Sequence, residues 1–148
     1  MEPLHSKSWL LQIAKALKNS RKINSEGLPI LVEGKRDKNI LIKLGFSGPI
    51  EILNRGWSID KLVINLLEKY EKSTNFKEPI IVLLMDWDRT GGGLQKKLRE
   101  NFVSMDKIVD ETLRRELIRL LNGRTKTVEG IGFILDELIP LMEELNKL

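Results

Sequence analysis

The chain has 148 residues, of which 41% are hydrophobic, and this is enough for one domain with a buried core. It contains no cysteine, which excludes disulfides and cysteine-based zinc sites. No apolar run reaches the roughly 18 residues that span a bilayer, and residues 1–7 lack the apolar core of a signal peptide. We therefore expect a cytoplasmic protein that does not enter a membrane.

The net charge of +4 is unevenly distributed along the chain. Residues 1–48 carry nine Lys or Arg and four acids, whereas residues 129–148 carry five acids and one lysine. A basic N-terminal region is compatible with nucleic acid, because counterions released from phosphates favour binding. Charged, solvent-exposed helix faces explain the same pattern, and charge by itself favours this simpler interpretation.

Apolar runs and amphipathic stretches alternate along the chain and predict strands and helices in turn. The expected strands are residues 29–33, 50–53, 79–85 and 107–109. The expected helices are residues 9–23, 37–44, 59–70, 94–102, 111–121 and 131–145, with Pro140 expected to kink or divide the last. Because strands and helices alternate, we predict an α/β fold with right-handed crossovers and a mostly parallel sheet of about four strands, flanked by helices.

Acidic residues follow two of the expected strands directly. Glu33 ends the first, and Asp86 and Asp88 follow the third, two residues apart. Ligands of open parallel sheets bind outside the carboxyl ends of the strands, where these side chains should meet. A single Asp at a strand end is usually a turn former or a helix cap. Several carboxylates together repel one another unless a proton or a cation intervenes, so the cluster favours a divalent metal site.

Two motifs carry a resemblance to a known family. An apolar strand ends in Glu33-Gly34, and about fifty residues later another apolar strand ends in Asp86-x-Asp88-x-x-Gly91. This order and spacing resembles the Toprim domain, found in topoisomerases, bacterial-type primases, certain nucleases and repair proteins. The resemblance covers roughly residues 28–130 and implies a Rossmann-like three-layer fold. It divides the chain into an N-terminal helical extension (1–27), the Toprim domain (28–130) and a C-terminal helix packed on it (131–148).

The resemblance also implies roles for individual residues. Glu33 would transfer protons and, with Asp86 and Asp88, would hold Mg²⁺, which Mn²⁺ can replace. Independently of the resemblance, Lys35, Arg36, Arg55 and Arg89 would bind the phosphates of RNA or DNA, and a simple offset of nearby acids would also explain these basic residues. Asp37 fits the first motif, but it would serve equally well as a cap of the helix that follows. The implied activity is that of a small Mg²⁺-dependent nuclease in RNA processing or DNA repair, similar to the ribonucleases that mature 5S ribosomal RNA.

Related activities fit the sequence less well. A topoisomerase needs a tyrosine nucleophile, and the only tyrosine, Tyr70, continues the apolar stripe of its helix and should lie in the core. A full-length primase needs further domains. Asp86-x-Asp88-x-Thr90 also matches haloacid-dehalogenase-type phosphatases, but there the motif ends the first strand, and Glu33 would be unexplained.

A second hypothesis comes from a different class of protein. The chain would then be a non-catalytic nucleic-acid-binding or accessory module of a larger RNA- or DNA-processing complex. The acidic residues of its last helix, Asp136, Glu137, Glu143 and Glu144, would face a basic partner. A solvated helix face explains these acids more simply.

Overall fold

The computed structural model describes residues 8–71 and 77–147. Its sheet has four strands, all parallel, in the order β2-β1-β3-β4. The strands are β1 (Ile30–Val32), β2 (Ile50–Ile52), β3 (Pro79–Leu83) and β4 (Ile108–Asp110). All four lie within or beside the stretches expected from the apolar runs, so the predicted α/β fold is confirmed.

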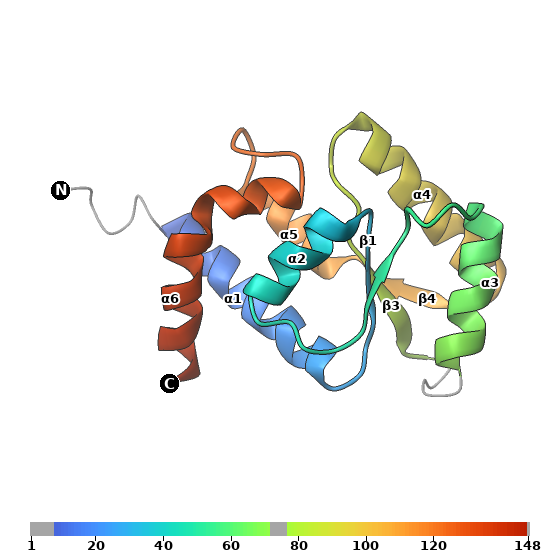
Figure 1. Ribbon diagram of the computed structural model, residues 1–148, viewed down its shortest axis with the longest axis horizontal. Coiled ribbons are helices and arrows are strands. Elements are labelled where there is room, and N and C mark those ends of the chain that lie inside the picture. The colour runs from blue at the N-terminus through green and yellow to red at the C-terminus, as the bar shows by residue number, and fades with distance from the viewer. Residues whose placement is uncertain (1–7, 72–76, 148) are drawn as a thin grey trace.

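Helices connect and cover the strands (Figure 1). They are α1 (Ser8–Ser25), α2 (Lys35–Lys43), α3 (Ile59–Tyr70), α4 (Arg89–Ser104), α5 (Thr112–Leu120), the 3₁₀ helix η3 (Glu129–Ile134) and α6 (Leu135–Asn146). In the described part of the chain, no helix combines the length and apolarity needed to cross a bilayer.

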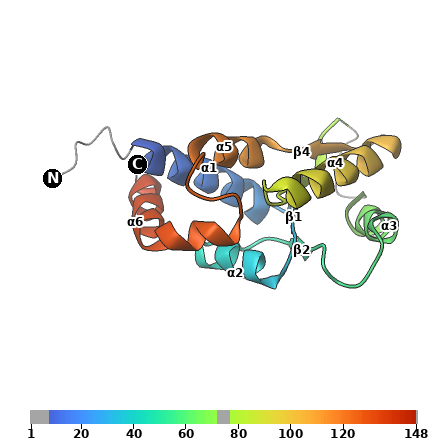
Figure 2. The same cartoon turned by 90° about the horizontal axis from the view of Figure 1, so that it is seen from above.

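The sheet is the middle of three layers, because both of its faces are apolar and each must be covered. Ile30 and Val32 face a cluster that α1, α2, α5 and α6 complete, whereas Leu31 and Leu83 face a second cluster with α3 and α4. The view from above shows these two groups of helices on opposite sides of the strands (Figure 2). The arrangement is the expected Rossmann-like three-layer fold.

The first helix belongs to the main core. Its residues Leu10, Ile13, Ala14 and Leu17 are buried in the same cluster as α5 and α6. Residues 8–25 of the stretch expected as a helical extension therefore pack as part of the domain.

Two helix boundaries differ from the prediction. The fourth helix begins at Arg89 rather than near residue 94, because Asp88 caps it and accepts the N–H of Gly91 at 2.7 Å. The tendency of three successive glycines to break a helix is overridden by this cap. The second difference is in the last expected helix. Helix α6 continues through Pro140, and the chain changes from 3₁₀ to α geometry at Ile134 rather than at the proline.

A buried glutamate joins β2 to α3. Glu51 is 6% exposed, and its carboxylate accepts hydrogen bonds from Arg55 at 2.9 Å, from Lys69 at 2.8 Å and from the hydroxyl of Tyr70. Burial alone would raise the pKa of Glu51, but the bonds from Lys69, Tyr70 and Arg55 lower it to about 2. The same contacts place Tyr70 in the core, as its sequence position predicted.

We predict that Glu51→Gln lowers the free energy of unfolding at neutral pH by about 2 kcal/mol, because charge-assisted bonds to a buried carboxylate are lost. The pKa of Glu51 is lowered on folding, so its stabilisation is present above the unfolded value of 4.5 and is lost as the pH falls toward 2. Urea unfolding of both proteins at pH 7 and pH 3 measures this. Glu68→Gln, on the exposed side of α3, is the matched control. An equal gap at both pH values would contradict the prediction.

Candidate functional site

The acidic residues meet where the strand order reverses. β1 lies between β2 and β3. The crossover from β1 to β2 passes through α2 on one face of the sheet, and the crossover from β2 to β3 passes through α3 on the other face. Glu33 directly follows β1, and Asp86 comes three residues after the end of β3. Such a switch point, at the carboxyl ends of the strands, is where open α/β sheets bind ligands.

The side chain of Glu33 completes the hydrogen bonding of β3. Leu84 donates its N–H to the carbonyl of Leu31 at 2.9 Å, in the normal parallel ladder. The next N–H on that side belongs to Asp86, and it donates to Oε2 of Glu33 at 2.8 Å. The carbonyl of Glu33 is already taken by the N–H of Asn54, at 2.9 Å. The two acids are therefore brought into contact by the main chain.

A second segment holds Asp86 from the other side. Its Oδ1 accepts the N–H of Val128 at 2.8 Å. Next to it, the N–H of Trp87 donates to the carbonyl of Lys126 and its indole Nε1 donates to the carbonyl of Thr125, both at 2.8 Å. Trp87 also packs against the main core. We call residues 125–128 the strap, because their main-chain groups form these hydrogen bonds with Asp86 and Trp87.

Gly91 is required by the position of Asp86. A Cβ atom at Gly91 would lie 2.1 Å from the carbonyl oxygen of Asp86, closer than any real contact. At the next two positions of α4, Gly92 and Gly93, a Cβ atom would meet nothing within 4 Å. The glycine of the Asp-x-Asp-x-x-Gly motif thus permits a close main-chain approach, and its two neighbours do not serve this purpose.

Asp37 is a helix cap. It is 7% exposed, and its Oδ2 accepts the N–H of Gly34 at 3.0 Å in a capping-box arrangement at the start of α2. This confirms the capping role that the sequence left open, and the carboxylate also lies close enough to Asp86 to interact with it electrostatically.

Burial and mutual repulsion perturb these acids. Burial raises the pKa of Glu33, and the charges of Asp86 and Asp37 raise it further. Burial also raises the pKa of Asp86, with the charge of Asp88 acting in the same direction and the N–H of Val128 opposing it. Without a cation, the pair therefore favours holding a proton between the two carboxyl groups.

Three of the four predicted phosphate-binding residues are exposed near this edge. Lys35 and Arg36 open α2 and Arg89 opens α4, and Arg36 forms a long ion pair with Glu129 at 3.5 Å. The fourth, Arg55, is turned inward: its Nε donates to the carbonyl of Ile52 at 2.7 Å, and it also binds Glu51. Its guanidinium stabilises the β2–α3 connection and is not oriented to bind a phosphate through two parallel hydrogen bonds.

The chemistry of the acids fits a hard divalent cation. In the described ranges, 8–71 and 77–147, no three or more His, Asp or Glu side chains form a group placed to hold one ion. Mg²⁺ is usually bound by one or two carboxylates, several waters and substrate phosphates. Asp86 with Glu33 satisfies that requirement, since a carboxylate that accepts one N–H keeps lone pairs for a metal. The predicted three-ligand set with Asp88 stays a prediction.

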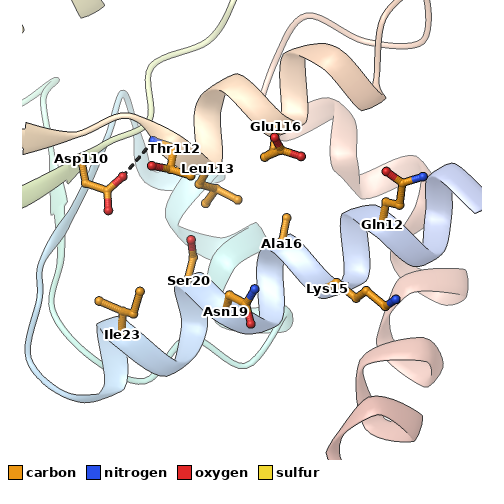
Figure 3. A pocket seen from close by; sticks show the side chains of 10 residues that line it. All are labelled: Gln12, Lys15, Ala16, Asn19, Ser20, Ile23, Asp110, Thr112, Leu113 and Glu116. Carbon is orange, nitrogen blue, oxygen red and sulfur yellow. Dashed lines mark hydrogen bonds between the residues drawn. The ribbon is translucent and has the colours of Figure 1, made fainter.

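Other features of the site had no signal in the sequence. Arg114 on α5 donates to the carbonyls of Met85 and Asp86, and Gln95 on α4 binds Met85 as well. Nothing in the local pattern distinguishes them from other polar helix residues. A separate hollow of about 450 Å³ between α1 and α5 is lined mainly by polar side chains, and none of the clustered acids reaches it (Figure 3).

Comparisons with known proteins place the chain in a family. No family model matches it. A UPF0292 protein of Methanocaldococcus jannaschii is 34% identical over 122 residues, which are 82% of this chain and 86% of that protein. A UPF0292 protein of Pyrococcus furiosus is 35% identical over 102 residues, or 69% of this chain and 70% of that protein. The chain belongs to the UPF0292 family.

The fold is also found in a solved structure. A protein from Aquifex aeolicus superposes with a TM-score of 0.61 at 28% sequence identity, covering 78% of this chain and 94% of that one. The shared part therefore includes most of the domain described here.

We predict that Asp86→Asn stabilises the metal-free protein at pH 7 by on the order of 1 kcal/mol. The asparagine keeps an oxygen for the N–H of Val128 and removes the repulsion from Glu33 and Asp88. Because the pKa of Asp86 is raised on folding, the destabilisation exists above that pKa and disappears as the pH falls toward the unfolded value of 3.8. Thermal unfolding in chelator at pH 7 and pH 4 measures the gain, which should shrink at pH 4. A loss of stability at pH 7 would refute it.

We also predict opposite effects at two neighbouring glycines. Gly91→Ala should lower the free energy of unfolding by about 2 kcal/mol or more, because its methyl group overlaps the carbonyl of Asp86. Gly93→Ala, in open space on the same helix, should raise it by about 0.5–1 kcal/mol through helix propensity alone. Denaturant unfolding of the two variants measures both changes. Similar free energies of unfolding for the two variants would show that the close approach to Asp86 does not restrict the side chain at position 91.

Proposed function

We propose that this protein is a Mg²⁺-dependent phosphodiesterase acting on RNA or DNA, a small nuclease of the Toprim type in RNA processing or DNA repair. The observation that supports this most is the contact between Glu33 and Asp86 at the switch point. These residues come from motifs 53 positions apart, and carboxylates there need a cation or a proton. The proposal also rests on Asp88, whose charge acts on Asp86 from the adjacent turn.

Asp86 and Glu33, with Asp88, would hold the ion. Bound Mg²⁺ would neutralise charge that develops on a phosphodiester and orient the attacking water. Glu33 would hold and return a proton, in keeping with the raised pKa that burial and the charge of Asp86 give it. The exposed side chains of Lys35, Arg36 and Arg89 would bind neighbouring phosphates of the substrate.

The test is a cleavage assay with labelled structured RNA, single-stranded DNA and duplex DNA, in Mg²⁺, Mn²⁺ or chelator. We expect metal-dependent cleavage of at least one substrate. Asp86→Asn should reduce it by about 100-fold or more, since even residues that only orient metal ligands are worth 10–100-fold in affinity or activity. Asp136→Asn, an exposed acid of α6, is the control for loss of one negative charge. Tyr70→Phe should retain activity, because this hydroxyl binds Glu51 in the core.

The outcomes separate the alternatives. No cleavage of any nucleic acid by a protein that binds the metal would refute the nuclease. Binding of nucleic acid without cleavage would instead support an accessory module of a larger RNA- or DNA-processing complex. Loss of cleavage in a folded Tyr70→Phe variant would revive a tyrosine nucleophile.

A further inference from the structure

The third strand continues beyond its neighbour on one side. β4 ends at Asp110, which pairs with Val82, so the carbonyl of Leu83 and the N–H of Met85 face no strand. Main-chain groups in a buried segment must still be bonded, because an unpaired one costs as much as a lost hydrogen bond. Side chains from α4 and α5 take the place of the missing strand.

Gln95 replaces one rung of the ladder. Its side chain is almost completely buried, and its Oε1 accepts the N–H of Met85 at 3.2 Å while its Nε2 donates to the carbonyl of Leu83 at 3.3 Å. The same amide nitrogen donates to Glu111 at 2.9 Å, and Glu111 also accepts from Arg99 at 2.8 Å. The amide is therefore held in one orientation by both helices.

Arg114 holds the next two carbonyl groups. Its Nε donates to the carbonyl of Met85 at 2.9 Å and its Nη2 donates to that of Asp86 at 3.0 Å. A planar guanidinium that binds two successive carbonyls fixes the peptide plane between them, which a single ammonium group cannot do. Burial lowers the pKa of Arg114, and the charges of Asp86 and Glu33 oppose this, so the cation also lies within electrostatic reach of both acids.

We propose that Arg114 and Gln95 are positioning residues of the metal site, which fix the main chain of Met85 and Asp86 so that the Asp86 carboxylate is preorganised for a divalent cation. This inference rests on the proposed function only in assuming that Asp86 binds the metal. The partners that orient metal ligands commonly contribute 10–100-fold to metal affinity.

Arg114 allows positioning to be separated from simple charge balance. If its role is to orient Asp86, then removing its two hydrogen bonds weakens metal binding. If it only balances the acids, then removing its positive charge strengthens the attraction of a cation, and a lysine in its place changes nothing. The two roles therefore predict effects of opposite sign for Arg114→Ala and different effects for Arg114→Lys.

The experiment measures the Kd for Mn²⁺ alone, from the paramagnetic resonance signal of free Mn²⁺, at constant ionic strength. The variants are Arg114→Ala, Arg114→Lys and Asp86→Asn, with Arg115→Ala as a matched control, since Arg115 is the adjacent exposed arginine of α5. Circular dichroism and thermal unfolding establish that each variant is folded. We expect the wild type to bind, Asp86→Asn to lose binding, both Arg114 variants to bind about 10-fold more weakly or worse, and Arg115→Ala to change the Kd by less than about 2-fold.

Each result bears on one claim. A wild type that binds no Mn²⁺, or that binds equally after Asp86→Asn, overturns the metal site and this inference with it. A wild type that binds through Asp86, with unchanged affinity in Arg114→Lys, overturns the positioning role alone, and this holds even if Arg114→Ala fails to fold. Tighter binding by Arg114→Ala also overturns it, because that is the result of charge balance.

Discussion

Beyond Leu84 the ladder between β1 and β3 does not continue through main-chain groups, since the carbonyl of Glu33 turns to the N–H of Asn54 on the other side. The N–H of Asp86 must still find an acceptor, and the side chain of Glu33 is within reach. This single hydrogen bond connects the ends of two neighbouring strands and brings two carboxyl groups together. The rest of the site surrounds this contact: the strap on one side, and the arginine and glutamine of the flanking helices on the other.

Two clusters of charged side chains, one around buried Glu51 and one at half-buried Glu33 and Asp86, have opposite consequences. At Glu51 a single carboxylate is matched by Arg55, Lys69 and Tyr70, and its pKa falls to about 2, which means that the folded state favours the charged form. At Glu33 and Asp86 the acids face one another, and burial and repulsion raise the pKa of each. The first group stabilises the fold, whereas the second opposes it. Strain of the second kind is a feature of functional sites, where a ligand relieves it.

The acid pair persists because its main chain is fixed by many contacts. Val128 and Gly91 donate N–H groups to Asp86 and Asp88, and Arg114 binds the carbonyl of Asp86. These donors lie on three separate segments, so no local rearrangement can release the acids without breaking several bonds. Such over-determined geometry would suit the metal ligands that we propose, since ordering them would cost little more on binding.

The sequence by itself determined the strands, the parallel sheet and the acids at its carboxyl edge, because the period of apolar residues and the alternation of elements are local properties. It also placed Tyr70 in the core. It misplaced the start of α4, where the cap at Asp88 overrides the weak helix propensity of glycine.

Only the tertiary structure decided which polar side chains serve the site. Arg55 lies at the predicted edge, yet buried Glu51 draws it inward. Arg114 reaches Asp86 across 28 residues and Val128 reaches it across 42. Arg114 makes its contact because β3 continues beyond the end of β4 and leaves main-chain groups that need a hydrogen-bonding partner. That depends on how the whole sheet and its helices are packed, and no local pattern encodes it.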